Sequence, residues 1–111
     1  MADIDDIIEA LKQFRNERDW EQFHNPKDLA IALSIESNEL LELFLWKDAR
    51  DVSGEKIKGE LADVFSFALL LTEKYGLNVK DIILEKIAEN AIKYPVDKSK
   101  GTAKKYTELS W

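Results

Sequence analysis

Four carboxylates stand in two equally spaced pairs, and they are the residues of this sequence best suited to chemistry. Glu36 and Glu39 are three positions apart, as are Glu60 and Asp63. On a helix, residues three apart point to nearly the same side, so each pair would present its oxygens together. Oxygen donors of this kind suit Mg²⁺, which is commonly shared between carboxylates and substrate phosphates. The spacing therefore favours a divalent cation site.

The apolar neighbours of these acids indicate which way the acids face. Both pairs share a helix side with large apolar residues, namely Leu33, Leu40 and Leu43 for the first and Val64, Phe67 and Leu71 for the second. At about 3.6 residues per turn, the three leucines lie within about 60° of Glu36, on the side that should face the interior. Unpaired buried carboxylates are costly, and crowded ones raise one another's pKa values. A divalent cation removes that cost; the alternative is a set of buried salt bridges with Lys56, Lys86 or Arg18.

The elements that must position these acids follow from apolar periodicity and capping residues. Helices are predicted over the apolar positions Ile4 to Phe14, from Pro26 to about Trp46, from about Gly54 to Tyr75, and from Asn78 to a point before Pro95. Asn25 is a suitable N-cap, and Pro26 fits the first helical position because no N–H is needed there. Gly76 is predicted to be a left-handed terminator, and Lys47–Ser53 a polar loop.

The predicted fold class is all-α, a bundle of about four helices without strand-like alternation. Short connections favour antiparallel neighbours. A chain of 111 residues has the usual size of one domain. We expect a single domain over residues 1–111, with a helical core over about 4–95 and a tail over 96–111 that docks through Tyr106, Leu109 and Trp111.

Composition excludes several classes of function. Sixteen Lys and Arg stand against 22 Asp and Glu, a net charge of −6, which argues against a general partner of DNA or RNA. Without cysteine there is no disulfide, thiolate nucleophile, Cys-ligated zinc or iron–sulfur cluster. No apolar run is longer than Phe67–Leu71, which is far shorter than the ~20 residues of a membrane span. The acidic start does not look like a signal peptide, so we expect a cytoplasmic protein.

The acid pairs also form a pattern that resembles a known family. Glu36-x-x-Glu39, twenty residues, then Glu60-x-x-Asp63 resembles the signature of the all-α nucleoside triphosphate pyrophosphohydrolases of the MazG type. Further motifs are similar to the dCTP pyrophosphatase branch of that superfamily: residues 17–24 with Pro26, Leu43-Phe44-x-Trp46-Lys47, Asn90-x-x-x-Tyr94-Pro95, and residues 105–109. Together they cover the chain from about residue 4 to residue 109.

The resemblance implies an activity and a cofactor. A triphosphate, dCTP or a related and even modified pyrimidine nucleotide, would be cut between its α and β phosphates to the monophosphate and pyrophosphate. Glu36, Glu39, Glu60 and Asp63 would hold Mg²⁺, with Mn²⁺ as a substitute. Glu36 or Glu39 would hold or deprotonate the attacking water, and the sequence does not choose between them. The family also implies a homo-oligomer, a tetramer built from dimers, in which neighbouring subunits complete each site.

Two tryptophans are candidates for the base pocket. The resemblance implies that Trp20 and Trp46 both line it, and a flat indole can stack on a nucleobase; otherwise both are ordinary packing residues. His24, the single histidine, belongs to the Trp20 motif and is a candidate contact for substrate or for another subunit. Animal members of the branch carry a His in the first helix near the position of Leu11, so the choice among pyrimidines stays open.

Polar side chains near the end of the fourth helix are candidate contacts for phosphate and sugar. Lys86 and Lys93 can pair with a triphosphate, and Asn90 can bond sugar or phosphate oxygens. The tail carries a further run of Lys98, Lys100, Lys104 and Lys105. Each of these groups could instead be a solvated surface. Two other functions remain open: a broad-specificity pyrophosphatase that clears unwanted nucleotides, and a helical interaction module without catalysis.

Overall fold

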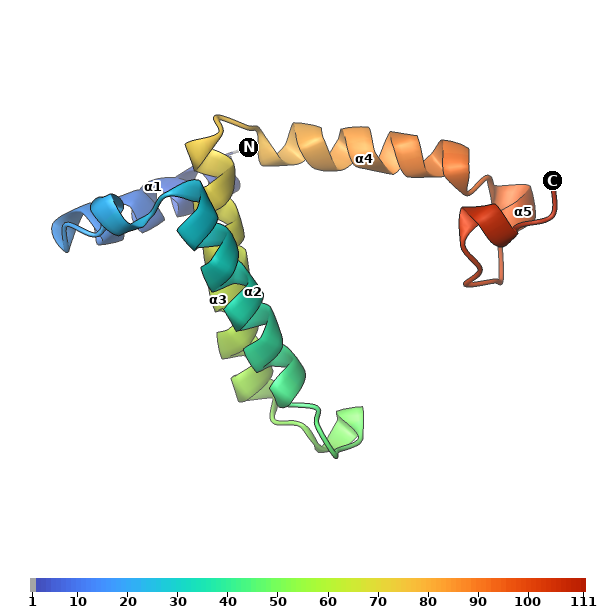
Figure 1. The fold of residues 1–111 in the computed structure, drawn as a ribbon, viewed down its shortest axis with the longest axis horizontal. Helices are drawn as coiled ribbons and strands as arrows, with labels where there is room; N and C mark the ends of the chain where they lie inside the picture. Colours follow the sequence, from blue (N-terminus) through green and yellow to red (C-terminus); the bar gives the residue numbers. More distant parts are fainter. Residues whose placement is uncertain (1) are drawn as a thin grey trace. The chain divides into compact units, whose positions relative to one another are not determined.

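The structure is a computed structural model that describes residues 2–111. All regular elements in this range are helices, so the predicted all-α class is confirmed (Figure 1). The chain divides into two compact units, one up to Leu77 and one from Asn78 to Trp111. Among the described residues, no helix is both long and apolar enough to cross a membrane.

The first unit is built around a helical hairpin. α2 (Pro26–Glu42) and α3 (Gly54–Lys74) lie side by side and antiparallel, joined by a loop with a 3₁₀ turn at Ala49–Asp51 (Figure 1). α1 (Ala2–Glu17) packs against α3 and leads into α2 through a second 3₁₀ turn, Glu21–Phe23. The predicted antiparallel neighbours are therefore α2 and α3, the two helices that carry the acid pairs.

The helix starts and the end of α3 are where the sequence predicts them. Asn25 caps α2 by accepting a hydrogen bond from the Asp28 backbone N–H at 2.9 Å, and Pro26 occupies the first helical position. Asn78 caps the following helix in the same way, from the Asp81 N–H at 3.0 Å. Gly76 has a φ of 62°. This is the left-handed conformation in which glycine readily ends a helix.

The predicted end of α2 is wrong by about one turn. The helix ends at Glu42, and turns follow before Trp46, which has a φ of 63°. A side chain with a β-carbon is unfavourable in that left-handed region, and an α-helix cannot continue through it. Trp46 is 99% exposed, so the indole stands clear of the hairpin end.

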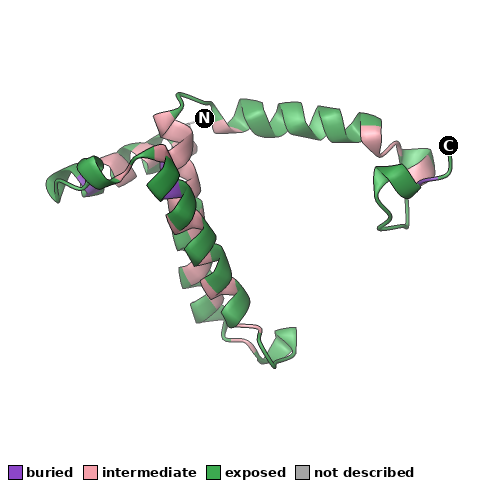
Figure 2. Cartoon of the chain, in the orientation of Figure 1, coloured by how far each residue is buried: buried purple, intermediate pink, exposed green. Residues whose placement is uncertain are grey.

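Burial in the first unit is concentrated where its helices meet. Leu29 of α2, Leu70 of α3 and Arg15 of α1 are 1%, 5% and 3% exposed. The facing sides of α2 and α3 are half-buried, whereas their outer sides are exposed (Figure 2). Ile35 and Phe65 on these outer sides are 51% and 63% exposed. A large apolar surface is therefore left uncovered by the unit itself.

The second unit consists of α4 (Val79–Lys93), the short α5 (Val96–Ser99) and a 3₁₀ turn at Tyr106–Glu108. The tail docks through Leu109, which is buried as predicted, while Tyr106 and Trp111 remain partly exposed. Tyr106 meets the edge of Tyr94 at a centroid distance of 5.9 Å, and its carbonyl accepts a hydrogen bond from Trp111 Nε1 at 3.1 Å. The apolar stripe of α4 is not buried by the rest of this unit: Ile83 and Ile87 are 51% and 58% exposed.

Candidate functional site

Three of the four acids meet between α2 and α3. One carboxylate oxygen each of Glu36, Glu60 and Asp63 lies within 4.8 Å of the other two. Glu36 and Glu60 are half-buried and Asp63 is exposed. Glu39 is half-buried nearly one turn further along α2 and does not belong to this three-way group. The antiparallel hairpin thus brings acids from both helices together, as their spacing predicts.

The surroundings of these acids fit a divalent cation. Glu36 Oε2 and Glu60 Oε2 are both buried and have no hydrogen-bond partner. Within residues 2–77, no ion pair joins any of the four acids to a lysine or arginine. Orphaned buried carboxylate oxygens are costly unless a cation meets them. An all-oxygen donor set suits hard ions such as Mg²⁺ and Mn²⁺.

Within residues 2–77, the salt bridges considered as an alternative are not formed by Arg18 or Lys56. Arg18 donates to the Phe14 carbonyl at 3.0 Å, and its guanidinium lies 3.7 Å from the centroid of the Phe14 ring. Lys86 pairs with Glu89 at 3.5 Å. Lys56 is exposed on the first turn of α3. The acid group is therefore not explained as a salt-bridged network.

Crowding changes the protonation of the acids. Burial first, then the adjacent Glu39 carboxyl, raises the pKa of Glu36 to about 7, with smaller effects from Asp63 and Glu60. Burial and the charge of Glu39 also raise the pKa of Glu60. Both shifts oppose the fully ionised state, which is the state that binds a cation. Cation binding would therefore release a proton near neutral pH.

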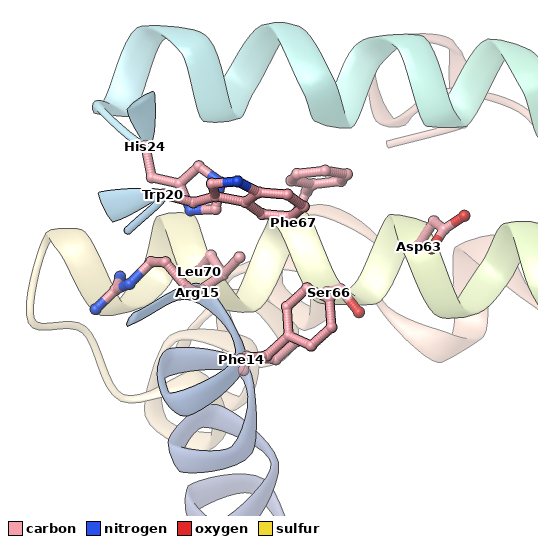
Figure 3. A pocket seen from close by; sticks show the side chains of 9 residues that line it. Phe14, Arg15, Trp20, His24, Asp63, Ser66, Phe67 and Leu70 are labelled. Carbon is pink, nitrogen blue, oxygen red and sulfur yellow. The ribbon is translucent and has the colours of Figure 1, made fainter. Parts of the chain in front are cut away.

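A cavity of about 290 Å³ adjoins the acid group (Figure 3). Asp63 belongs to the acid group and also lines this cavity. Aromatic rings dominate its wall: Phe14 and Trp20 meet edge to face at 5.8 Å, and Phe67 of α3 contributes a third ring. Leu11 also lines the cavity. This is the first-helix position near which the resemblance implies a histidine in animal members of the branch, and it is apolar here. The cavity offers flat apolar faces beside a cluster of oxygen ligands.

His24 supplies a polar group to the same cavity. The imidazole is half-buried, and its buried Nδ1 has no hydrogen-bond partner. Burial lowers the pKa of His24, and the charges of Arg15 and Lys74 lower it further. A neutral imidazole with an unused ring nitrogen can exchange a hydrogen bond with a ligand that enters.

The two tryptophans do not meet within one chain. Trp20 lies before the start of α2 and Trp46 beyond its end. The helix between them, α2, has 17 residues. Because an α-helix rises about 1.5 Å per residue, roughly 25 Å of helix separates the two indoles. A single chain therefore places Trp20 in the cavity and leaves Trp46 elsewhere.

The predicted contacts for phosphate and sugar lie on α4, in the second unit. Asn90 and Lys86 are exposed, and Lys86 pairs with Glu89. The Lys93 ammonium lies 5.1 Å from the centroid of the Tyr106 ring. In the tail, Lys98 lies 5.6 Å from the ring of Trp111. These lysines are available as cations, and Lys93 and Lys98 are oriented by aromatic neighbours.

Comparison with known proteins identifies the family. The profile of the MazG-like family matches residues 31–109. This chain belongs to the MazG-like family. It is also similar to two mammalian proteins named dCTP pyrophosphatase 1: it is 35% identical to that of Mus musculus and 33% to that of Homo sapiens, over 96% of this chain and 67% of each relative. The crystal structure of a pyrophosphatase from Archaeoglobus fulgidus superposes with a TM-score of 0.79 at 31% identity, over 86% of this chain and 94% of that one.

These similarities confirm three interpretations of the sequence: the MazG-type resemblance, the all-α class and the assignment to the nucleotide pyrophosphatases. Other residues that line the cavity in this MazG-like protein were not selected as site residues from the sequence, among them Phe14, Arg15, Ser66, Phe67 and Leu70. Phe14 could have been found, because it continues the apolar stripe of Leu11 on α1. Arg15 and Ser66 carry no local signal, because only the packing of α1 on α3 brings them to the cavity.

The raised pKa of Glu36 predicts how stability depends on pH. Its carboxyl has a pKa of about 7 in the folded metal-free protein against an ordinary 4.5. Between these values the folded state holds the proton more tightly than the unfolded state, so stability should fall as pH rises from about 5 through about 7. We expect the Tm of the metal-free protein to drop over this range. The drop should be smaller in Glu36→Gln, and Mg²⁺ should raise the Tm most at pH 8.

The control is Glu42→Gln, which changes an exposed carboxylate near the end of the same helix. The Tm of that variant should depend on pH in the same way as the Tm of the wild type. A Tm of the metal-free wild type that is flat or rising between pH 5 and 8 would contradict the crowding of the acids.

Proposed function

We propose that this protein hydrolyses a nucleoside triphosphate between its α and β phosphates, releasing the nucleoside monophosphate and pyrophosphate. The proposed substrate is dCTP or a related pyrimidine deoxynucleotide, including modified ones. The observation that carries the proposal is that the acid group and the aromatic cavity share Asp63. A nucleotide has the matching two parts, an anionic triphosphate and a flat ring. The relatives named dCTP pyrophosphatase 1 support the choice of base.

The proposed cation is Mg²⁺, or Mn²⁺ in its place, held by Glu36, Glu39, Glu60 and Asp63. When bound, it would neutralise phosphate charge and make a nearby water more acidic. Hydrolysis forms a bond from a water oxygen to the α-phosphorus and breaks the bond to the bridging oxygen, which leaves with pyrophosphate. A carboxylate must take the water's proton, and a base works best with a pKa near the working pH. Glu36 or Glu39, neighbours on the same side of α2, is proposed to take that proton.

The base would enter the aromatic cavity. Trp20 offers a face for stacking, with Phe14 and Phe67 on the remaining wall. The unpartnered Nδ1 of His24 would exchange a hydrogen bond with the edge of the base. Lys86, Asn90 and Lys93 are proposed contacts for phosphate and sugar oxygens. The MazG-like match runs from residue 31 to residue 109 and so spans both compact units, which supports a single functional domain.

A second copy of the chain would complete the site. Trp46 is 99% exposed. It lies roughly one helix length from Trp20, so it can stack on the same base only if another subunit supplies it. The uncovered apolar sides of α2 and α3, including Ile35 and Phe65, are suited to burial between subunits. We propose a homo-oligomer, a tetramer built from dimers.

A broad-specificity nucleotide pyrophosphatase is the second candidate. It is favoured by Leu11, which gives that part of the cavity wall no hydrogen-bonding group for distinguishing one base from another. Discrimination between bases depends on hydrogen bonds that the wrong base leaves unmade, and an apolar wall supplies none.

A panel of nucleoside triphosphates tests the proposed function. With Mg²⁺ present, we expect the products to be monophosphate and pyrophosphate, and kcat/KM to be highest for dCTP or a C5-modified dCTP. Glu60→Gln should lower kcat at least ~100-fold for every nucleotide, because it removes an oxygen ligand without changing the cavity. Glu55→Gln, an exposed acid on the first turn of the same helix, is the control. Equal kcat/KM across the panel would select the broad-specificity enzyme, and no turnover would reject both.

Mixing of variants tests whether Trp46 acts in the site of another subunit. Trp20→Ala and Trp46→Ala should each reduce kcat/KM about 5- to 150-fold, the loss of one stacking contact of roughly 1–3 kcal/mol. Co-expressing the two variants should restore about a quarter of wild-type activity, because half of randomly formed dimers are mixed and each mixed dimer has one intact site.

The control is the double variant Trp20→Ala/Trp46→Ala, co-expressed with the wild type. Every mixed dimer then lacks one tryptophan in each site, so activity should not exceed that of the wild-type dimers present. A mixture of the two single variants that is no more active than its components would show that the tryptophans do not share a site across subunits.

A further inference from the structure

Arg15 is a buried cation at the junction of α1, the connection to α2, and α3. Its side chain is 3% exposed, although arginine is almost never fully buried unless it is paired. The stem lies along the cavity beside Leu70, while the guanidinium points away from the rings of Phe14 and Phe67 (Figure 3). Arg15 therefore lines the cavity without presenting its charge to a ligand.

The guanidinium joins carboxylates from two elements. Nη1 of Arg15 lies 3.4 Å from Glu73 Oε2 near the end of α3, and Nη2 lies 3.9 Å from Glu21 Oε1. Nε donates to Asn16 Oδ1 at 3.2 Å. Glu21 Oε1 is also 3.5 Å from Lys74 Nζ. The four charged residues alternate in sign, and Glu21 is the member that belongs to the connection between α1 and α2.

That connection has few other attachments through its side chains. Trp20, Glu21 and Phe23 are 43%, 57% and 61% exposed, so apolar burial holds the segment weakly. Asp19 has a φ of 55°, an unfavourable left-handed conformation for a residue with a β-carbon. The Trp20 N–H does donate to the Arg15 carbonyl at 3.0 Å, which fixes the backbone against α1. Within residues 2–77, the pair of Glu21 with Lys74 joins this segment directly to α3. The pair of Glu21 with Arg15 joins it to α1, from which Arg15 reaches Glu73 of α3.

We propose that Arg15 is a positioning residue for nucleotide binding: through Glu21 and Glu73 it holds the Trp20–His24 segment against α3, so that Trp20 and His24 face the cavity. This inference rests on the proposed function, in which those two residues contact the base.

The chemistry of the guanidinium suits this role. Its planar fork reaches two carboxylates in different directions at once, whereas an ammonium is a single point charge. Removing the cation takes away the positive charge between Glu21 and Glu73 and leaves Lys74 as the ion-pair partner of Glu21, so the segment should be held less firmly against α3. After burial, the charge of Arg15 also contributes to the lowered pKa of His24.

Three variants and two readouts test the proposal. Arg15→Met keeps the stem and removes the charge. Glu21→Ala removes the pairs of this segment with both Arg15 and Lys74 but keeps the Arg15–Glu73 pair, and Lys12→Met is the control. Lys12 lies one turn earlier on α1 and pairs only locally, with Glu9 at 3.3 Å. We expect Arg15→Met and Glu21→Ala to raise KM for the best nucleotide of the panel about tenfold with kcat within about threefold, since binding of the base is weakened and the acid group is untouched. An additional variant, Arg15→Lys, should fall between wild type and Arg15→Met.

The second readout does not need catalysis. In a Trp46→Phe/Trp111→Phe background, acrylamide should quench the fluorescence of Trp20 more strongly in Arg15→Met and Glu21→Ala than in the parent or in Lys12→Met. If Arg15→Met does not fold, Glu21→Ala decides the question, because Glu21 is 57% exposed and its loss leaves no buried charge behind. Wild-type KM and quenching in Glu21→Ala would overturn the proposal, as would a loss of Mg²⁺ affinity equal to the rise in KM. A wild type that turns over no nucleotide would instead overturn the proposed function, and the quenching would still test what Arg15 positions.

Discussion

Repulsion between carboxylates held in a half-buried helical hairpin is the constraint on which the rest of this structure depends. The same apolar stripes that pack α2 against α3 carry Glu36 and Glu60, so association of the two helices also brings their charges together. The raised pKa of Glu36 and the buried oxygens of both glutamates that have no hydrogen-bond partner are consequences of bringing these charges together. A fold that keeps such a cluster gives up some of its own metal-free stability, a cost that a bound cation would offset.

The second half of the site is arranged by a different interaction. The aromatic cavity lies where α1 crosses α3. Trp20, one of its aromatic residues, belongs to the exposed connection between α1 and α2 rather than to an α-helix. Apolar packing alone would hold that connection loosely, so the buried charge of Arg15 links it to the end of α3. Asp63 belongs to both halves, so a base in the proposed cavity would be positioned relative to the acids.

Local signals in the sequence predict the helices and the acid group, and long-range packing explains what they miss. Asn25 and Pro26 define the start of α2 by themselves, but its end has no glycine or proline, and the apolar period continues past Glu42 until Trp46 turns left-handed. The spacing of the acids predicts their meeting because it needs only two antiparallel helices. Arg15 looks like one more charge at the polar end of α1, since its partner Glu73 is 58 residues away. The separation of Trp20 from Trp46 likewise follows from the length of α2, which motif matching does not consider.

The most direct test of the account is the titration of the Glu36 side-chain carboxyl, followed by its ¹³C chemical shift with and without Mg²⁺. Without the cation, the account predicts a midpoint near 7, because burial and Glu39 disfavour the charged form. With saturating Mg²⁺, the midpoint should fall below the ordinary 4.5, because the ion favours the carboxylate. A midpoint near 4.5 under both conditions would mean that the acids neither crowd one another nor bind a cation, and the proposed chemistry would lose its basis.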